Sequence, residues 1–262
     1  MKTTDFGSEL RRVLEDVTEV SLYIWESGWS ASSGGNLSVD VTDLLTAEDA
    51  VPESSEEFPL LLAVPELAGR SLLSTVSGSR FRDVPRRPEQ ALMLIQISTE
   101  GDRYRVLWGA EGGGRPTIEL LPHLKVHGSL RSRAPQQKVV LHTHPQHLIA
   151  MTHLPEYRNP DFVRVLQTSQ TTAKVFLKEG VGMARYMPMG SEQLAERTVD
   201  LLRGRRAVIW ERHGCLAVGC DVFEAFDVTD LIEKAAQVFL LCVASGYEPK
   251  GMTPDEVAAL GD

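Results

Sequence analysis

The order of apolar and polar residues predicts a helix at the start of the chain and a strand soon after it. Over residues 8–28 apolar side chains recur at the three- and four-residue spacing of one helix face. The residues on that face are Leu10, Val13, Leu14, Val17, Val20 and Leu22. From residue 33 the period changes, because a Ser/Gly turn leads into Leu37, Val39 and Val41, which alternate with polar residues as in a strand.

The remaining pattern predicts strands and helices in alternation. We expect further strands at 71–76, 91–98, 102–110, 138–144 and 207–219, and further helices at 117–133, 145–154, 191–203 and 222–245. Tight turns link several of the strands, so the predicted fold is α/β, with a mixed, mainly antiparallel central sheet covered by helices in a single domain over 1–262. Residues 42–58 are acidic and contain Ser and Pro, and we interpret them as a surface excursion.

Composition narrows the class of protein. The chain has 27 basic and 36 acidic side chains, a formal charge of −9 and no long Lys/Arg run, which argues against nucleic acid as the main partner. Its three cysteines form no CxxC motif, so a reducing compartment suits them better than a disulfide framework. The N-terminus lacks the apolar core of a signal peptide, and the apolar stretch 235–246 is too short to span a bilayer. We therefore expect a cytoplasmic protein that does not enter a membrane.

Histidine placement gives the sharpest chemical signal. His142 and His144 stand two residues apart at the end of a predicted strand, where both rings project from the same face and can reach one metal ion. The third candidate ligand is His213, which follows the apolar run AVIW and precedes Gly214. His147 competes for that role, and the alternative for the whole pair is two histidines that bond the backbone at a strand end.

A second set of polar residues is Glu119, His123 and His127, spaced four apart on one predicted helix face. The histidines could bind a metal, or they could be ordinary solvated side chains, and the spacing alone favours the second interpretation. Glu119 lies early in this helix, after a Gly-rich loop, where a carboxylate facing a metal pocket could act as a general base.

Two short Ser/Gly turns form a third candidate feature. They are residues 33–36 and 77–79, and their backbone N–H groups, with Ser and Asn side chains, could hold a phosphate. Each could equally be an ordinary turn.

Several motifs occur together in one order. They are GGNLSV at 34–39, SGSRFRDV at 77–84, VLWG at 106–109, PTIELLPH at 116–123, VVLHTHPQHLIAMTHL at 139–154, EGVG at 179–182 and RHGCLAVGCDVFEAFDVTDLIEKAAQVFL at 212–240. Through these motifs the chain resembles the class II aldolase/adducin family, and within it the bacterial L-rhamnulose-1-phosphate aldolases. The resemblance covers roughly residues 15–245.

The resemblance implies a function and assigns roles to residues. It implies zinc-dependent retro-aldol cleavage of a ketose 1-phosphate, foremost L-rhamnulose 1-phosphate, to dihydroxyacetone phosphate and L-lactaldehyde. It also implies a homotetramer with active sites near subunit interfaces. The zinc ligands would be His142, His144 and His213, the catalytic acid/base Glu119, and the phosphate-binding residues Gly35, Asn36, Ser77, Gly78 and Thr117. His123 and His127 would then be support residues.

The sequence departs from the rhamnulose-phosphate aldolases at three positions. Ser33 and Ile118 stand where those enzymes usually have asparagine and serine. Thr172, which cannot ionise, lies near the position where those enzymes have an acidic residue that assists proton transfer from a neighbouring subunit. Two alternatives follow: another zinc enediolate enzyme, such as a sugar-phosphate epimerase or dehydratase, and a non-catalytic adducin-like binding module.

Overall fold

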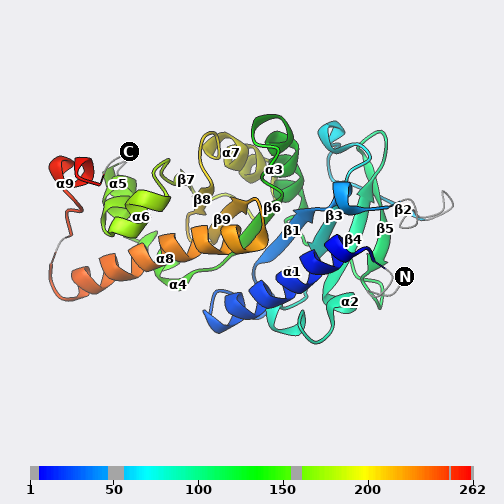
Figure 1. Cartoon of the computed structure of the whole chain (residues 1–262), viewed down its shortest axis with the longest axis horizontal. Coiled ribbons are helices and arrows are strands. Elements are labelled where there is room, and N and C mark those ends of the chain that lie inside the picture. Colours follow the sequence, from blue (N-terminus) through cyan, green and yellow to red (C-terminus); the bar gives the residue numbers. More distant parts are fainter. Residues whose placement is uncertain (1–5, 47–55, 155–160, 248, 261–262) are drawn as a thin grey trace.

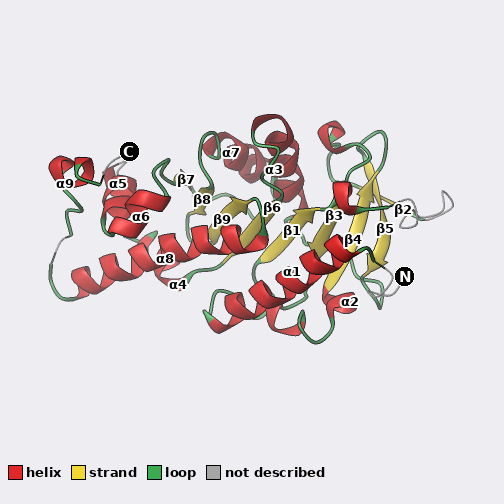
Figure 2. Cartoon of the chain, in the orientation of Figure 1, coloured by secondary structure: helices red, strands yellow, loops and turns green. Residues whose placement is uncertain are grey.

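The structure, a computed structural model, describes residues 6–46, 56–154, 161–247 and 249–260. These residues form a nine-stranded sheet in which every neighbouring pair is antiparallel except β7 and β8. Across the sheet the strands are β2 (Glu57–Pro59), β5 (Arg103–Gly109), β4 (Leu92–Ile97), β3 (Ser71–Thr75), β1 (Asn36–Asp40), β6 (Val139–Thr143), β9 (Gly214–Gly219), β8 (Ala207–Trp210) and β7 (Gly182–Ala184). The predicted mixed, mainly antiparallel sheet covered by helices is confirmed (Figure 2).

Helices pack on both faces of this sheet. The α-helices are α1 (Ser8–Glu26), α2 (Pro88–Ala91), α3 (Leu120–Arg133), α4 (Gln146–Met151), α5 (Asp161–Thr168), α6 (Thr171–Phe176), α7 (Glu192–Leu201), α8 (Val222–Ala244) and α9 (Pro254–Ala258). Short 3-10 helices are η2 (Thr42–Leu44), η4 (Pro65–Leu67) and η5 (Phe81–Asp83). In Figure 1, α1 and α8 cross in front of the sheet, whereas α3 and α7 lie behind it. Among the described helices, none is both long and apolar enough to cross a lipid bilayer.

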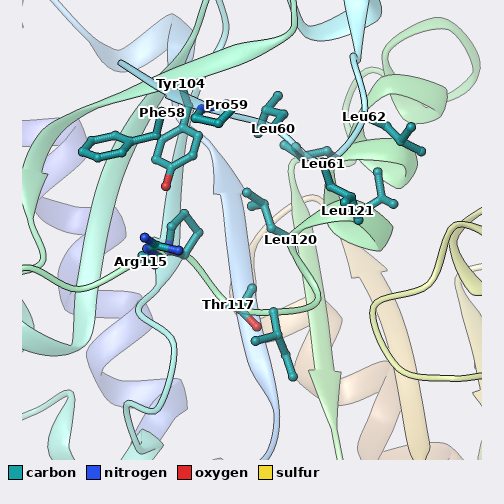
Figure 3. A pocket seen from close by; sticks show the side chains of 13 residues that line it. Phe58, Pro59, Leu60, Leu61, Leu62, Tyr104, Arg115, Thr117, Leu120 and Leu121 are labelled. Carbon is teal, nitrogen blue, oxygen red and sulfur yellow. The ribbon is translucent and has the colours of Figure 1, made fainter. Parts of the chain in front are cut away.

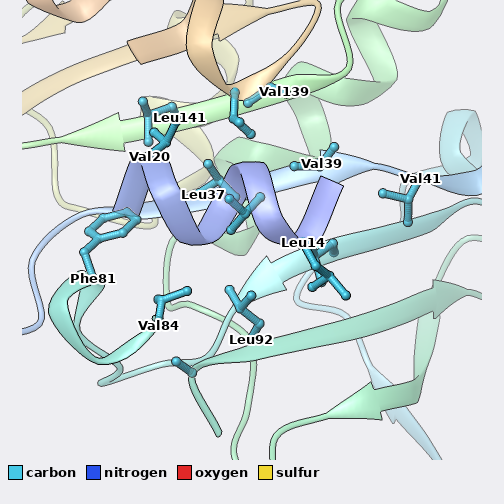
Figure 4. Close-up of a cluster of buried hydrophobic side chains, with 14 of the residues drawn as sticks. Leu14, Val20, Leu37, Val39, Val41, Phe81, Val84, Leu92, Val139 and Leu141 are labelled. Atoms are coloured by element: carbon cyan, nitrogen blue, oxygen red, sulfur yellow. The ribbon is translucent and has the colours of Figure 1, made fainter. Parts of the chain in front are cut away.

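Apolar and polar residues alternate along β1, and this pattern fits helices on both faces of the sheet. Leu37 and Val39 pack with the apolar face of α1, as Figure 4 shows. The intervening Ser38 points to the opposite side, where α3 covers it, and all five residues of β1 are buried. A strand that reads as half-exposed is therefore buried on both faces, because a polar network lies under α3.

The structure corrects four details of the sequence-based expectations. The helix expected at 117–133 begins at Leu120, and the strand expected at 207–219 is two strands, β8 and β9, joined by the turn 211–213. The excursion at 42–58 ends in β2, which adds to the sheet by pairing with β5, while residues 47–55 lie outside the described residues. On α1, Leu22 is half-buried and Ile24 is buried instead.

Candidate metal centre and active site

The structure brings three predicted histidines together at one end of the sheet. His142 lies in β6, His144 directly follows that strand, and His213 lies in the turn between β8 and β9. Since β6 pairs with β9, and β9 with β8, the end of β6 lies beside that turn. One ring nitrogen from each histidine lies within 4.8 Å of the other two, and the Nε2 atoms of His142 and His144 are 3.0 Å apart.

The surroundings of His142 fix which of its nitrogens faces the centre. Its Nδ1 lies 2.9 Å from the backbone carbonyl oxygen of Cys215, which can only accept, so Nδ1 carries the proton and donates it. Nε2 then presents its lone pair to the other histidines, which is the arrangement of a metal-binding imidazole.

Burial keeps all three rings neutral at physiological pH. It holds the pKa of His142 well below its usual value, with the neighbouring imidazoles as further causes. Burial also lowers the pKa of His144, and it lowers that of His213 to about 4 with a contribution from His144. Neutral imidazole is the form that binds a metal.

Glu119 is the residue immediately before α3, and its side chain lies beside His142 and His213. Its carboxylate is buried, with Oε2 3.3 Å from Nε2 of His142 and Oε1 3.5 Å from Nε2 of His213. The amide of Asn36 donates to Oε2 at 2.8 Å, whereas Oε1 has no hydrogen-bond partner among the described residues. Burial raises the pKa of Glu119, and the hydrogen bond from Asn36 offsets part of that rise.

These contacts test whether a divalent metal fits. The unprotonated Nε2 of His142 and the carboxylate of Glu119 both present electron pairs across 3.3 Å, and a cation removes the resulting repulsion. In a tetrahedral zinc site with bonds of about 2.0 Å, ligand nitrogens lie about 3.3 Å apart, close to the observed 3.0 Å between His142 and His144. Three imidazoles with room for a further ligand are typical of a catalytic zinc site.

Glycines give the ligands their space. A Cβ at Gly214 would lie 2.3 Å from the carbonyl oxygen of Thr143, and 3.0 Å from ring carbons of both His142 and His144. A Cβ at Gly34 would lie 2.6 Å from Nδ1 of His144. Side chains at these two positions would displace the ligands, so the local sequence is tied to the histidine cluster.

Two of the predicted phosphate-binding residues, Asn36 and Thr117, contact Glu119. Asn36 bonds its carboxylate, and Thr117 accepts a hydrogen bond from the Glu119 backbone at 3.3 Å. Gly35, with φ +80°, precedes Asn36 at the start of β1. The exposed turn at Ser77 and Gly78 is held next to the loop between β5 and α3, because Ser77 donates its N–H to the carbonyl of Arg115 in that loop at 2.8 Å.

A mostly apolar pocket of about 290 Å³ adjoins Thr117 (Figure 3). Its lining includes Leu61 and Ile118, which are 76% and 66% exposed. Ile118 is thus an apolar side chain presented to solvent beside the candidate active site.

His123 and His127 are not solvated. Both are buried, and the hydroxyl of Ser38 lies 2.7 Å from Nδ1 of His123 and 2.8 Å from Nε2 of His127. Burial lowers the pKa of His123 to about 3 and that of His127 to about 4. The solvated interpretation is wrong, and the two rings join α3 to β1 behind Glu119.

The other sequence candidates lie away from the histidine cluster. His147 binds the buried carboxylate of Glu233 through Nδ1 at 2.7 Å, and His153 is exposed. Ser33 is exposed in the turn before β1, and Thr172 is exposed on α6, which packs against α5 and α8.

Sequence reasoning missed the residues that support the ligands. The ring of Trp210 packs against His142 and His213, with centroids 4.5 and 5.1 Å apart. Thr152 accepts a hydrogen bond at 2.9 Å from the backbone N–H of Arg212, the residue before His213. The position of Trp210, three residues before a ligand, was the one available signal, since the contact from Thr152 spans 60 residues.

Comparison with known proteins agrees with this geometry. Residues 15–240 match the Class II Aldolase and Adducin N-terminal domain. The chain therefore belongs to the class II aldolase and adducin family, and with its three-histidine metal site it is a class II, metal-dependent aldolase, a lyase.

Within the family, the chain is similar to sugar-phosphate aldolases. The chain is 33% identical to a rhamnulose-1-phosphate aldolase of Bacteroides thetaiotaomicron, over 95% of this chain and 92% of the relative. It is 32% identical to one of Pectobacterium atrosepticum, over 91% and 88%. A solved sugar-phosphate aldolase from Thermotoga maritima superposes with a TM-score of 0.80 at 28% identity, covering 93% of this chain and all of that one.

Proposed function

We propose that this protein is a zinc-dependent aldolase that cleaves L-rhamnulose 1-phosphate to dihydroxyacetone phosphate and L-lactaldehyde. The observation that carries the proposal is the buried carboxylate of Glu119 in contact with two histidines of a three-histidine metal site. The similarity to rhamnulose-1-phosphate aldolases supports the choice of substrate.

His142, His144 and His213 would hold the metal through neutral imidazole nitrogens. When bound, a divalent zinc ion polarises the oxygens of a ketose and stabilises the negative charge that develops as the carbon–carbon bond breaks.

Glu119 would move the proton. Oε2 is occupied by the amide hydrogen of Asn36, so Oε1 is the oxygen positioned to take a proton from the substrate hydroxyl next to the breaking bond. The raised pKa of the carboxyl makes it a stronger base than a solvated glutamate, as this step requires. The hydroxyl that loses its proton becomes the aldehyde of L-lactaldehyde, and the same oxygen can return the proton to the carbon of the dihydroxyacetone phosphate half that keeps the electron pair of the broken bond.

The substrate phosphate would lie between Gly35, Asn36, Ser77, Gly78 and Thr117. We further propose a cytoplasmic homotetramer with active sites near subunit interfaces. The exposure of Ile118 and Leu61 beside Thr117 supports an interface there, because apolar side chains are stabilised by removal from water.

Two variants and one assay test the proposal. Glu119→Gln should retain bound zinc but lower the turnover of L-rhamnulose 1-phosphate by at least about 100-fold, because the amide cannot take the proton. His144→Ala should lose zinc. Metal content is measured by mass spectrometry, and dihydroxyacetone phosphate release by NADH-coupled reduction.

The outcomes separate the candidate functions. Purified protein that binds no zinc would contradict both enzymatic hypotheses and favour an adducin-like binding module. Bound zinc without cleavage would favour a sugar-phosphate epimerase or dehydratase. A Glu119→Gln variant with near-normal turnover would show that another group is the base.

A further inference from the structure

A second pocket lies on the side of the Ser77–Gly78 turn where η5 and α2 pack. It has a volume of about 480 Å³ and is lined by residues 76–80 and by Asp83, Arg86, Arg87, Gln90 and Ala91. The lining thus combines the turn with the segment that returns the chain to β4.

This pocket is positively charged in an acidic protein. Arg80, Arg86 and Arg87 line it with Asp83 as the one acidic lining residue, which leaves two net positive charges, whereas the whole chain carries −9. Within the part of the chain that the structure describes, none of the three guanidinium groups forms an ion pair or a hydrogen bond. Their charge is therefore available to a ligand.

The backbone of the turn adds neutral donors. Gly78 has φ +78°, a conformation that favours glycine, and the N–H groups of Gly78 and Arg80 bond no acceptor among the described residues. Unpaired backbone N–H groups beside arginines are typical of sites for phosphate, since both kinds of donor match its oxygens.

The pocket lies at the same end of the sheet as the metal centre. The turn follows β3, which pairs with β1, and β1 begins at Asn36, the partner of Glu119. Phe81 packs against the loop before β1, so closely that a Cβ at Gly35 would lie 3.0 Å from its ring. The arginine-lined pocket and the metal centre thus share one end of the sheet.

We propose that Arg80, Arg86 and Arg87 reach the substrate phosphate from this side of the Ser77–Gly78 turn and add positive charge to the phosphate site proposed above. This inference rests on the proposed function, because it assigns the charge that recognises the phosphorylated end of the same substrate. These arginines are then specificity-determining residues, which separate a sugar phosphate from the free sugar by the charge of its phosphate.

The test compares the double variant Arg86→Gln/Arg87→Gln with Arg82→Gln. Arg82 is an exposed arginine of the same segment that does not line the pocket, so it controls for the loss of one positive charge nearby, half of the change in the double variant. Binding of inorganic phosphate is measured by calorimetry, and kcat and KM for L-rhamnulose 1-phosphate are measured with the zinc-loaded enzyme. The double variant should raise both the Kd of phosphate and the KM by about tenfold and keep kcat within about twofold, because the lost contacts bind and do not react.

Each outcome decides one question. An unchanged phosphate Kd in the double variant, or an equal loss in Arg82→Gln, would overturn the assignment of the pocket. If the wild type binds phosphate, the double variant loses it and neither cleaves L-rhamnulose 1-phosphate, the pocket stands as a phosphate site and the proposed substrate is wrong. Normal cleavage with unchanged KM in the double variant would retain the function and reject the arginines.

Discussion

Thr152 should control metal affinity although it touches none of the ligands. Its buried hydroxyl, just past the end of α4, donates to the carbonyl of Ile149 at 2.7 Å and accepts the N–H of Arg212 at 2.9 Å. Arg212 has φ +60°, a left-handed conformation that costs a residue with a Cβ about 1–2 kcal/mol. The hydroxyl therefore holds the turn that presents His213 in a conformation it would otherwise leave.

Thr152→Val keeps the shape of the side chain and removes the acceptor. A hydrogen bond of this kind contributes about 1 kcal/mol, and leaving its donor unpaired costs about 1–3 kcal/mol. If about 1–2 kcal/mol of this loss falls on the metal-bound arrangement, zinc affinity falls by about 5- to 30-fold. Competition with a chromophoric chelator measures the Kd of zinc directly, without reference to turnover.

Two further variants test whether the effect comes from the Thr152 hydroxyl and from the left-handed conformation of Arg212. Thr152→Ser retains the hydroxyl and should keep the wild-type Kd. Arg212→Gly removes the penalty of the left-handed conformation, so Thr152→Val should cost less zinc affinity in that background than in the wild type. A wild-type zinc Kd in Thr152→Val, with the fold intact, would refute the reasoning.

Three further predictions concern the same end of the sheet. Gly214→Ala should lose most zinc binding, because its Cβ would lie 2.3 Å from a carbonyl oxygen of β6; a chelator titration that matches wild type would contradict this. Ser38→Ala should lower the free energy of unfolding by about 1–3 kcal/mol in a urea titration, since it leaves ring nitrogens of His123 and His127 unpaired. The metal-free protein should lose stability as the pH falls from 7 to 5. The unfolded histidines take up protons near pH 6.5, whereas burial holds the pKa of His127 and His213 at about 4, so each costs about 2 kcal/mol at pH 5. Equal urea midpoints at the two pH values would exclude this linkage.

The sequence predicted the features whose signals are local. The helical period of α1 lies within one element, and the HxH spacing covers three consecutive residues at the end of β6; the structure has both where the pattern indicates. The spacing of Glu119, His123 and His127 was also recognised, but not its burial. Burial depends on what lies opposite, and Ser38 of β1 stands 85 residues from His123.

The parts that sequence could not predict are set by contacts between distant segments. The polar turn at 211–213 divides the expected strand 207–219 into β8 and β9, and this turn places His213 beside the end of β6. The arginine-lined pocket likewise joins two stretches of the segment 76–91, and no period in the sequence shows that Arg86 and Arg87 face the turn at Ser77.

β1 and β6 are neighbours in the sheet, but the parts of the centre that they bring together come from distant parts of the sequence. Glu119 and the proposed phosphate-binding residues all precede β6, whereas the three metal-ligating histidines lie in or after it. During synthesis Glu119 therefore leaves the ribosome before any of the three histidines, and the histidine set is complete only after residue 213. All three histidines can hold a metal ion only after β8 and the turn that follows it have been made, and a chain truncated before β8 would retain Glu119 but lack His213.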